Sequence, residues 1–130
     1  MPTRLLLVDD HAVVRSGLRM LLENESGMQI VGEAGSAAEA LLAVERLEPD
    51  VVLMDIGLPD TSGIEATRQI KRLRPSVAVV ALTIHEDEEY FFKMLDAGAT
   101  GYVPKRAAAE ELIQAIQAAA AGEVYLYPSL

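Results

Sequence analysis

The stretch RLLLVDDH, residues 4–11, decides the fold and raises its main chemical question. Four apolar residues, Leu5 to Val8, suit a buried strand, but two adjacent carboxylates, Asp9 and Asp10, follow at once. Like charges side by side repel each other and resist burial unless a cation lies near them. We therefore expect a positive charge at the end of this strand.

The composition of the chain limits its class of function. Its 130 residues suffice for one domain with a sizeable core, and the absence of cysteine excludes disulfides, thiolate metal sites and thiol nucleophiles. No apolar run approaches the ~18 residues of a membrane span, and the N-terminus does not read as a signal peptide. The net charge is -9 and the basic residues are scattered, apart from KRLR at 71–74. We expect a cytoplasmic protein that does not itself bind DNA.

Apolar runs alternate along the chain with segments of helical spacing. The runs that we interpret as strands are residues 4–8, 28–34, 50–54, 76–82 and 101–103. Three of them are almost wholly apolar, as is typical of a parallel sheet covered on both faces. Between the runs, apolar residues three and four apart indicate helices, five in all. Strict alternation with short links predicts a doubly wound α/β fold with right-handed crossovers.

Local signals mark the ends of several helices. The pattern S-x-x-E at residues 36–39 and again at 62–65 matches a capping box, which begins a helix. The acidic run EDEE at 86–89 indicates the start of a further helix, because the helix dipole favours negative charge there. Gly98 is placed to end that helix.

Polar residues follow the strands at one edge of the predicted sheet. Asp9 and Asp10 follow the first strand, Asp55 ends the third, Thr83 ends the fourth, and Lys105 comes shortly after the fifth. Each of these residues alone could be a helix cap or could have no role. In doubly wound folds, however, ligands bind at the carboxyl ends of the strands. Three carboxylates, a hydroxyl and an ammonium at this edge therefore indicate a site.

The chemistry of these groups favours phosphoryl transfer. Mg²⁺ typically takes one or two carboxylates, waters and a phosphate oxygen, and it makes adjacent carboxylates tolerable. A magnesium ion beside a lysine neutralises the oxygens of a phosphoryl group. A carboxylate can accept that group as an acyl phosphate. Asp55 is the best candidate, because it stands alone on its strand whereas the adjacent pair suits the metal.

The same set of residues, in this order and on these strands, resembles the receiver domain of a two-component response regulator. The resemblance covers essentially the whole chain and implies the (βα)5 flavodoxin-like receiver fold, with strand order 2-1-3-4-5. Three stretches are especially similar to the NarL/FixJ branch of the family: VDDHAVVRSGLRMLLE (8–23), DIGLPDTSGIEATRQI (55–70) and GATGYVPK (98–105).

The resemblance implies a phosphoacceptor and a metal site. Asp55 would accept a phosphoryl group from a sensor histidine kinase. Asp9, Asp10 and the acceptor itself, together with the backbone carbonyl of Gly57, would hold Mg²⁺. We interpret His11, beside the acid pair, as the residue that starts a helix rather than as a metal ligand.

The resemblance also implies a switch. Thr83 would turn its hydroxyl to the phosphoryl group, Lys105 would pair with that group, and Tyr102 would move inward together with the threonine. This movement would change the surface around the helix that begins near Asp87 and would favour a homodimer.

The sequence departs from the common receiver pattern at two places. Pro104 precedes Lys105, whereas many receivers have a proline after that lysine, and here Arg106 follows, so a cis Lys-Pro bond is impossible. The isomer of the Val103-Pro104 bond stays open, with trans the expectation. Ile84 stands where small residues are common in the family, so we expect it to narrow access to the acyl phosphate.

We interpret residues 1–121 as the receiver domain and 122–130 as the start of a linker to an absent C-terminal output domain. The expected function is a phosphorylation switch that regulates transcription through a LuxR-type helix-turn-helix, and not a turnover enzyme. Two alternatives stay open: a free-standing receiver that docks on a partner protein, and an aspartyl-phosphate phosphatase. The phosphatase fits less well, since such enzymes commonly carry two aspartates one residue apart after the first strand, whereas Asp9 and Asp10 are adjacent.

Overall fold

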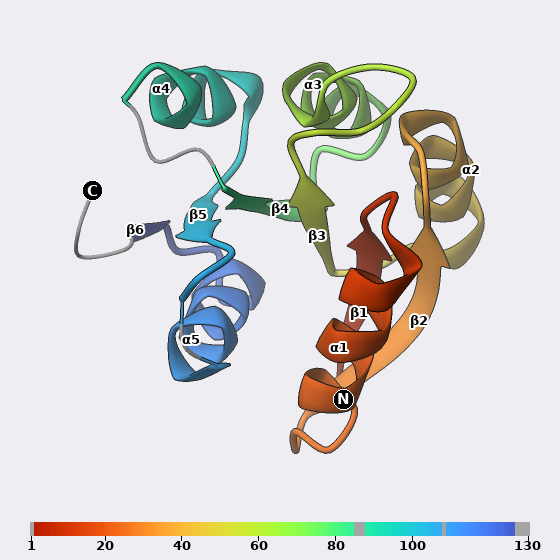
Figure 1. The fold of residues 1–130 in the computed structure, drawn as a ribbon, viewed down its shortest axis with the longest axis vertical. Helices are drawn as coiled ribbons and strands as arrows, with labels where there is room; N and C mark the ends of the chain where they lie inside the picture. The colour runs from red at the N-terminus through yellow and green to blue at the C-terminus, as the bar shows by residue number, and fades with distance from the viewer. Residues whose placement is uncertain (1, 85–87, 108, 127–130) are drawn as a thin grey trace.

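The computed structural model describes residues 2–84, 88–107 and 109–126. Within them, strands and helices alternate, and the strands form one parallel sheet in the order β2-β1-β3-β4-β5-β6 (Figure 1). The strands are β1 (Thr3–Val8), β2 (Met28–Ala34), β3 (Val51–Asp55), β4 (Ala78–Thr83), β5 (Gly101–Pro104) and β6 (Tyr125–Leu126). The helices are α1 (Ala12–Leu22), α2 (Ala37–Leu47), α3 (Gly63–Leu73), α4 (Glu88–Ala97) and α5 (Ala109–Ala120).

The structure confirms the predicted fold and adds one short strand to it. The five predicted strands lie in the predicted order 2-1-3-4-5, with the five predicted helices between and after them. Residues 122–130 are predicted to be the start of a linker, and within them Tyr125 and Leu126 form β6, which pairs with β5 at Gly101 and Tyr102. The backbone N–H of Tyr125 donates to the carbonyl of Thr100 at 2.8 Å. The domain boundary at residue 121 stays a prediction.

Helices cover both faces of the sheet. Helices α1 and α5 lie on one face, and α2, α3 and α4 lie on the other (Figure 1). Successive residues of β1 serve these two faces in turn: Leu5 and Leu7 pack into the α1–α5 core, while Leu6 and Val8 pack into the opposite core. All residues of β3, in the middle of the sheet, are buried, which explains its unbroken apolar run.

The predicted helix starts are confirmed where the structure describes them. Ser36 caps α2 by accepting a hydrogen bond from the backbone N–H of Glu39 at 3.2 Å. Ser62 caps α3 in the same way, by accepting from the backbone N–H of Glu65 at 3.1 Å. These bonds satisfy N–H groups that have no partner inside the helix. No helix in the described ranges combines the length and the apolar character needed to span a membrane.

Helix α4 has the predicted acidic first turn and the predicted end. Glu88 and Glu89 lie in that turn, while residues 86 and 87 of the acidic run lie outside the described residues. Gly98 follows the helix with a φ of 110°, and its N–H donates to the carbonyl of Leu95 at 3.0 Å. A residue with a side chain rarely adopts this φ, so glycine suits the position.

Candidate functional site at the carboxyl edge of the sheet

The carboxyl ends of β1 and β3 bring together four potential metal ligands. Asp9, Asp10, His11 and Asp55 each offer one ligand atom, and these atoms lie within 4.8 Å of one another. Asp9 and Asp55 are only 1% and 6% exposed, whereas Asp10 faces solvent. Buried carboxylates this close repel each other, so the cluster requires positive charge.

Lys105 supplies part of that charge. Its Nζ lies 3.0 Å from Oδ2 of Asp9 and 3.1 Å from Oδ1 of Asp55. Burial by itself would lower the pKa of Lys105, but its hydrogen bonds to Asp9 and Asp55 and their negative charges raise that pKa above the ordinary value. The lysine is therefore charged at neutral pH. One lysine cannot neutralise three carboxylates, which leaves the cluster suited to a divalent cation.

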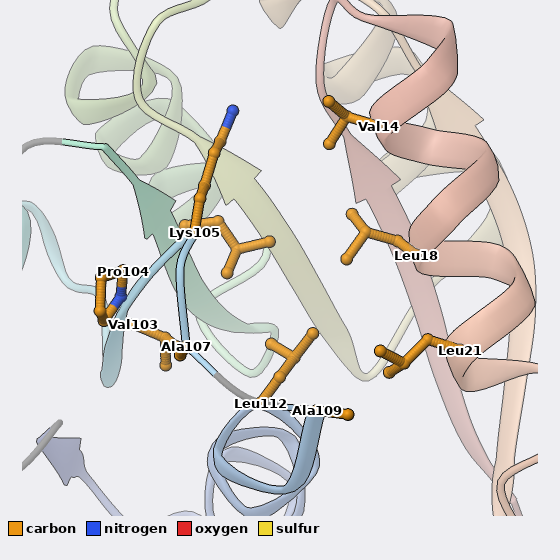
Figure 2. Close-up of a pocket in the computed structure, with 10 residues that line it drawn as sticks. Val14, Leu18, Leu21, Val103, Pro104, Lys105, Ala107, Ala109 and Leu112 are labelled. Atoms are coloured by element: carbon orange, nitrogen blue, oxygen red, sulfur yellow. The ribbon is translucent and has the colours of Figure 1, made fainter.

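The aliphatic part of the Lys105 side chain lies beside apolar residues. Figure 2 shows it at one end of a pocket of about 240 Å³ between α1 and α5, with Leu18 and Leu21 on one wall and Leu112 on the other. The nitrogen points away from these leucines, out of the pocket. Methylene groups thus pack on apolar side chains while the charged end reaches the acids.

His11 starts α1, as predicted, and its ring lies against the acid pair. Its backbone is extended, with φ -98° and ψ 112°, and its side chain makes no capping hydrogen bond. Instead, Nδ1 lies 3.0 Å from Oδ1 of Asp10 and 3.2 Å from Oδ1 of Asp9. The backbone N–H of His11 donates to Asp9 Oδ1 at 2.8 Å. These bonds fix the orientation of the buried carboxylate.

Arg15 also stabilises the backbone beside the acid pair, although the sequence analysis does not identify it. Its Nη1 donates to the backbone carbonyl of Asp9, and its Nε donates to Glu33 at 3.0 Å. Hydrogen bonds from Arg19 and then Arg15 hold the pKa of Glu33 below its ordinary value, against the opposing effect of burial. A helical pattern alone cannot reveal this role, because one partner follows β1 and the other lies on β2.

The other predicted site residues line a neighbouring hollow. Asp55, Gly57, Thr83 and Lys105 line a pocket of about 370 Å³, together with His11, Val14 and Ile84. The backbone N–H of Lys105 donates to the carbonyl of Thr83 at 2.8 Å, which sets the lysine beside the end of β4. The side chain of Thr83 is buried, and Ile84 is 76% exposed. The pocket therefore joins the hydroxyl, the ammonium and the candidate acceptor.

Tyr102 lies deeper than these residues. It is fully buried on β5, and its ring packs edge-on against that of Phe91 on α4, with 5.3 Å between the ring centroids and 87° between the planes. It pairs with Ala81, two residues before Thr83 on β4. The Val103-Pro104 bond that follows is trans. Tyr102 thus connects the strand that leads to Lys105 with α4.

The loop after Asp55 returns close to the end of its own strand. The N–H of Gly63, the first residue of α3, donates to the carbonyl of Ile56 at 2.7 Å. A Cβ atom on Gly63 would collide with the backbone of Asp55 and Ile56. Glycine is therefore required here by close packing of the backbone. The N–H of Gly57 donates to Asp55 Oδ1 at 3.3 Å, which places the loop backbone beside this carboxylate.

Comparison with known proteins agrees with this geometry. The response regulator receiver domain family matches residues 5–117. The response regulator GacA of Pseudomonas viridiflava is 43% identical over 127 residues, which are 98% of this chain and 59% of GacA. The response regulator UvrY of Escherichia coli K12 is 41% identical over 121 residues, which are 93% of this chain and 56% of UvrY. The chain thus spans less than two thirds of the length of these relatives.

A solved structure shows the same fold over the whole chain. The crystal structure of a LuxR-family two-component response regulator from Aurantimonas sp. SI85-9A1 has a TM-score of 0.95 and 40% sequence identity, and the match covers 99% of this chain and 92% of that one. The family match includes the acid cluster, Thr83 and Lys105. From its motifs, its strand order and these matches, the chain belongs to the response regulator receiver domains, in the NarL/FixJ branch with GacA and UvrY.

Proposed function

We propose that the chain is a phosphorylation switch in which Asp55 accepts a phosphoryl group from a sensor histidine kinase. The observation that carries this proposal is the setting of Asp55. Its carboxylate is almost fully buried, lies 3.1 Å from Lys105, and opens on the pocket that Thr83 lines. A nucleophile, a charge for the transferred oxygens and a hydroxyl are thus side by side.

We further propose that the acid cluster holds Mg²⁺. Asp9, Asp10 and Asp55 would be its side-chain ligands, and the backbone carbonyl of Gly57 would be another. The close approach of the carboxylates supports this assignment, because it gives a hard cation several oxygen ligands. When bound, the ion supplies positive charge to the oxygens of the transferred group.

Asp55, Lys105 and Thr83 each have a separate role in the transfer. A carboxylate oxygen of Asp55 forms a bond to phosphorus while the bond from phosphorus to the donor's imidazole nitrogen breaks, and the electron pair of that bond leaves with the imidazole. Lys105 exchanges its contact with the Asp55 carboxylate for a contact with a phosphoryl oxygen. The hydroxyl of Thr83 donates a hydrogen bond to another oxygen of the phosphoryl group.

The switch would run from Thr83 through Tyr102 to α4. Tyr102 is fully buried against Phe91 of α4, so a change at the end of β4 can reach that helix through packed side chains. The resulting surface would favour a homodimer and control a C-terminal DNA-binding domain that regulates transcription in the cytoplasm. The longer relatives support an additional domain, and a charge of -9 supports DNA contact only through such a domain.

Phosphorylation by a small acyl-phosphate donor tests the proposal. In the presence of Mg²⁺, the intact mass should rise by one phosphate, whereas Asp55→Asn, or the parent chain in EDTA, should keep its mass. Phosphate on Asp55→Asn would assign a different acceptor. Sustained release of phosphate from small phosphate esters would favour the phosphatase alternative over the switch.

A further inference from the structure

A carboxylate in the loop after Asp55 reaches across to a different crossover of the fold. Asp60 accepts hydrogen bonds from the backbone N–H groups of Ala37, 2.9 Å from Oδ1, and of Ala38, 3.0 Å from Oδ2. These are the first two residues of α2. The N–H groups of Ala37 and then Ala38 hold the pKa of Asp60 below its ordinary value, so it is ionised at neutral pH.

Capping of α2 does not account for the position of Asp60. The same helix end has its own local cap, because Ser36 accepts from the N–H of Glu39 at 3.2 Å. The Glu39 carboxylate in turn accepts from the N–H of Gly35 at 3.1 Å. A cap from within the chain segment itself is the ordinary arrangement. Asp60 adds a second cap from a loop more than twenty residues away, and thereby joins two loops.

The two loops joined by Asp60 lie beside different parts of the acid cluster. On one side, Asp60 lies in the loop between Asp55 and α3, which also contains Gly57, whose N–H donates to the Asp55 carboxylate. On the other side, α2 follows directly from the end of β2. There the carbonyl of Ala34 accepts from the N–H of Asp9 at 3.0 Å. The bonds of Asp60 therefore connect two segments. One is hydrogen-bonded to the backbone of Asp9, and the other follows Asp55.

We propose, resting on the proposed function, that Asp60 is a positioning residue for the metal and phosphoryl site. It fixes the distance between the loop of Gly57 and the segment behind Asp9, so that the oxygen ligands are already arranged before the cation binds. Interactions that orient metal ligands from outside the ligand set typically change metal affinity by ~10- to 100-fold when removed. A loop that must be ordered on binding lowers affinity in the same way.

The test is a comparison of Asp60→Ala with Ser36→Ala in the full chain. Both substitutions remove a cap from the same end of α2, but only the first releases the loop after Asp55. We expect Asp60→Ala to weaken Mg²⁺ binding, measured by titration calorimetry with MgCl2, by about tenfold. Ser36→Ala should bind Mg²⁺ like the parent. Phosphorylation of Asp60→Ala by a small acyl phosphate should need correspondingly more Mg²⁺ and should approach the parent rate at saturation.

The possible outcomes separate this inference from the proposed function. Equal Mg²⁺ affinity in Asp60→Ala and the parent, or equal weakening in Ser36→Ala, would show that Asp60 is merely a helix cap. If Asp60→Ala does not fold, Asp60→Asn replaces it, because its carbonyl keeps one of the two bonds to α2 and should weaken Mg²⁺ binding severalfold. A parent chain that binds no Mg²⁺ and takes no phosphate would overturn the proposed function itself, and this inference with it.

Discussion

Lys105 and Lys71 are two half-buried lysines near opposite ends of the parallel strands, and the groups to which they donate differ in charge. Lys105, beyond the carboxyl end of β5, donates to the carboxylates of Asp9 and Asp55. Lys71, at the end of α3, donates to the backbone carbonyls of Pro75 and Val77 at 2.8 and 2.7 Å, beside the amino end of β4. Burial lowers the pKa of Lys71, whereas the two carboxylates outweigh burial and raise the pKa of Lys105.

The difference separates a lysine that serves the fold from one that serves the site. Carbonyls satisfy the N–H groups of Lys71 but offset none of its charge. Its stem is also tightly packed, since a Cβ on Gly98 would lie 2.8 Å from its Cγ. Lys105 instead neutralises the carboxylates that would receive metal and phosphate, so its contacts could be exchanged during the proposed transfer. The comparison therefore predicts different consequences for the same substitution at the two positions.

The largest effect is expected from Lys105→Met. Methionine keeps much of the stem but leaves the carboxylates of Asp9 and Asp55 unneutralised in a buried place. We expect the rate of phosphorylation by a small acyl phosphate to fall by ~100-fold, as when one charged or hydrogen-bonding group is removed from a transferred oxygen. The free energy of unfolding without metal should fall by about 3 kcal/mol, since the partner charges stay behind. Intact mass measured at a series of quenched time points gives the rate, and urea unfolding gives the free energy of unfolding.

Lys71→Met is the matched control for this loss. It removes a lysine of similar burial and should leave the rate of phosphorylation unchanged. A comparable loss of rate in both variants would mean that Lys105 acts through general stability, which would contradict its place in the site.

The sequence predicts that the side chains of the site meet, because Asp55 and Thr83 end their strands and Asp9 and Lys105 follow the ends of theirs. Once strands and helices alternate, topology alone brings Asp9, Asp55, Thr83 and Lys105 to one edge, without any knowledge of side-chain packing. The structure places these side chains as expected. The ends of strands were less well predicted. Asp50 was assigned to β3, but its carboxylate accepts from the backbone N–H of Arg4 at 2.8 Å and it precedes the strand.

The features that the sequence missed depend on partners far apart in the chain. The sequence around Asp60 does not reveal its role, because the helix that it caps begins more than twenty residues earlier. Arg15 likewise joins Asp9, which follows β1, to Glu33 on β2. Strand β6 is too short to show an alternating pattern, and it forms because β5 offers a free edge to Tyr125. Periodicity describes a face of an element, but it does not identify the residue that the face meets.

A smaller effect is expected from Lys71→Met on stability. The substitution keeps the packed stem and removes the hydrogen bonds to Pro75 and Val77. We expect the free energy of unfolding to fall by about 1 kcal/mol, because the lost bonds are partly offset by relief of a poorly solvated charge. Urea unfolding at neutral pH measures it, with Arg72→Met, an exposed cation on the same helix, as the control. A loss as large as that of Lys105→Met would remove the distinction between the two lysines.

The smallest effect, and the most specific one, is the dependence of these losses on alkaline pH. Both lysines have an ordinary pKa of 10.5 in the unfolded chain. The pKa of Lys71 is lowered by folding, so between its folded value and 10.5 the unfolded state binds more protons, and the contribution of Lys71 to stability rises with pH. The pKa of Lys105 is raised, so its contribution is complete below 10.5 and is lost as the pH rises toward the folded value.

The free energy of unfolding of the parent minus that of each variant isolates these contributions, because the other lysines and the tyrosines cancel. In metal-free buffer between about pH 8 and about pH 11, the difference for Lys71→Met should increase with pH, whereas that for Lys105→Met should decrease above the unfolded pKa. Each change should be well below the losses at neutral pH, since both side chains are partly solvated. Differences that run in the same direction would show that the carboxylates do not control the charge of Lys105. The opposite signs follow only if neutral carbonyls surround one ammonium and charged oxygens surround the other.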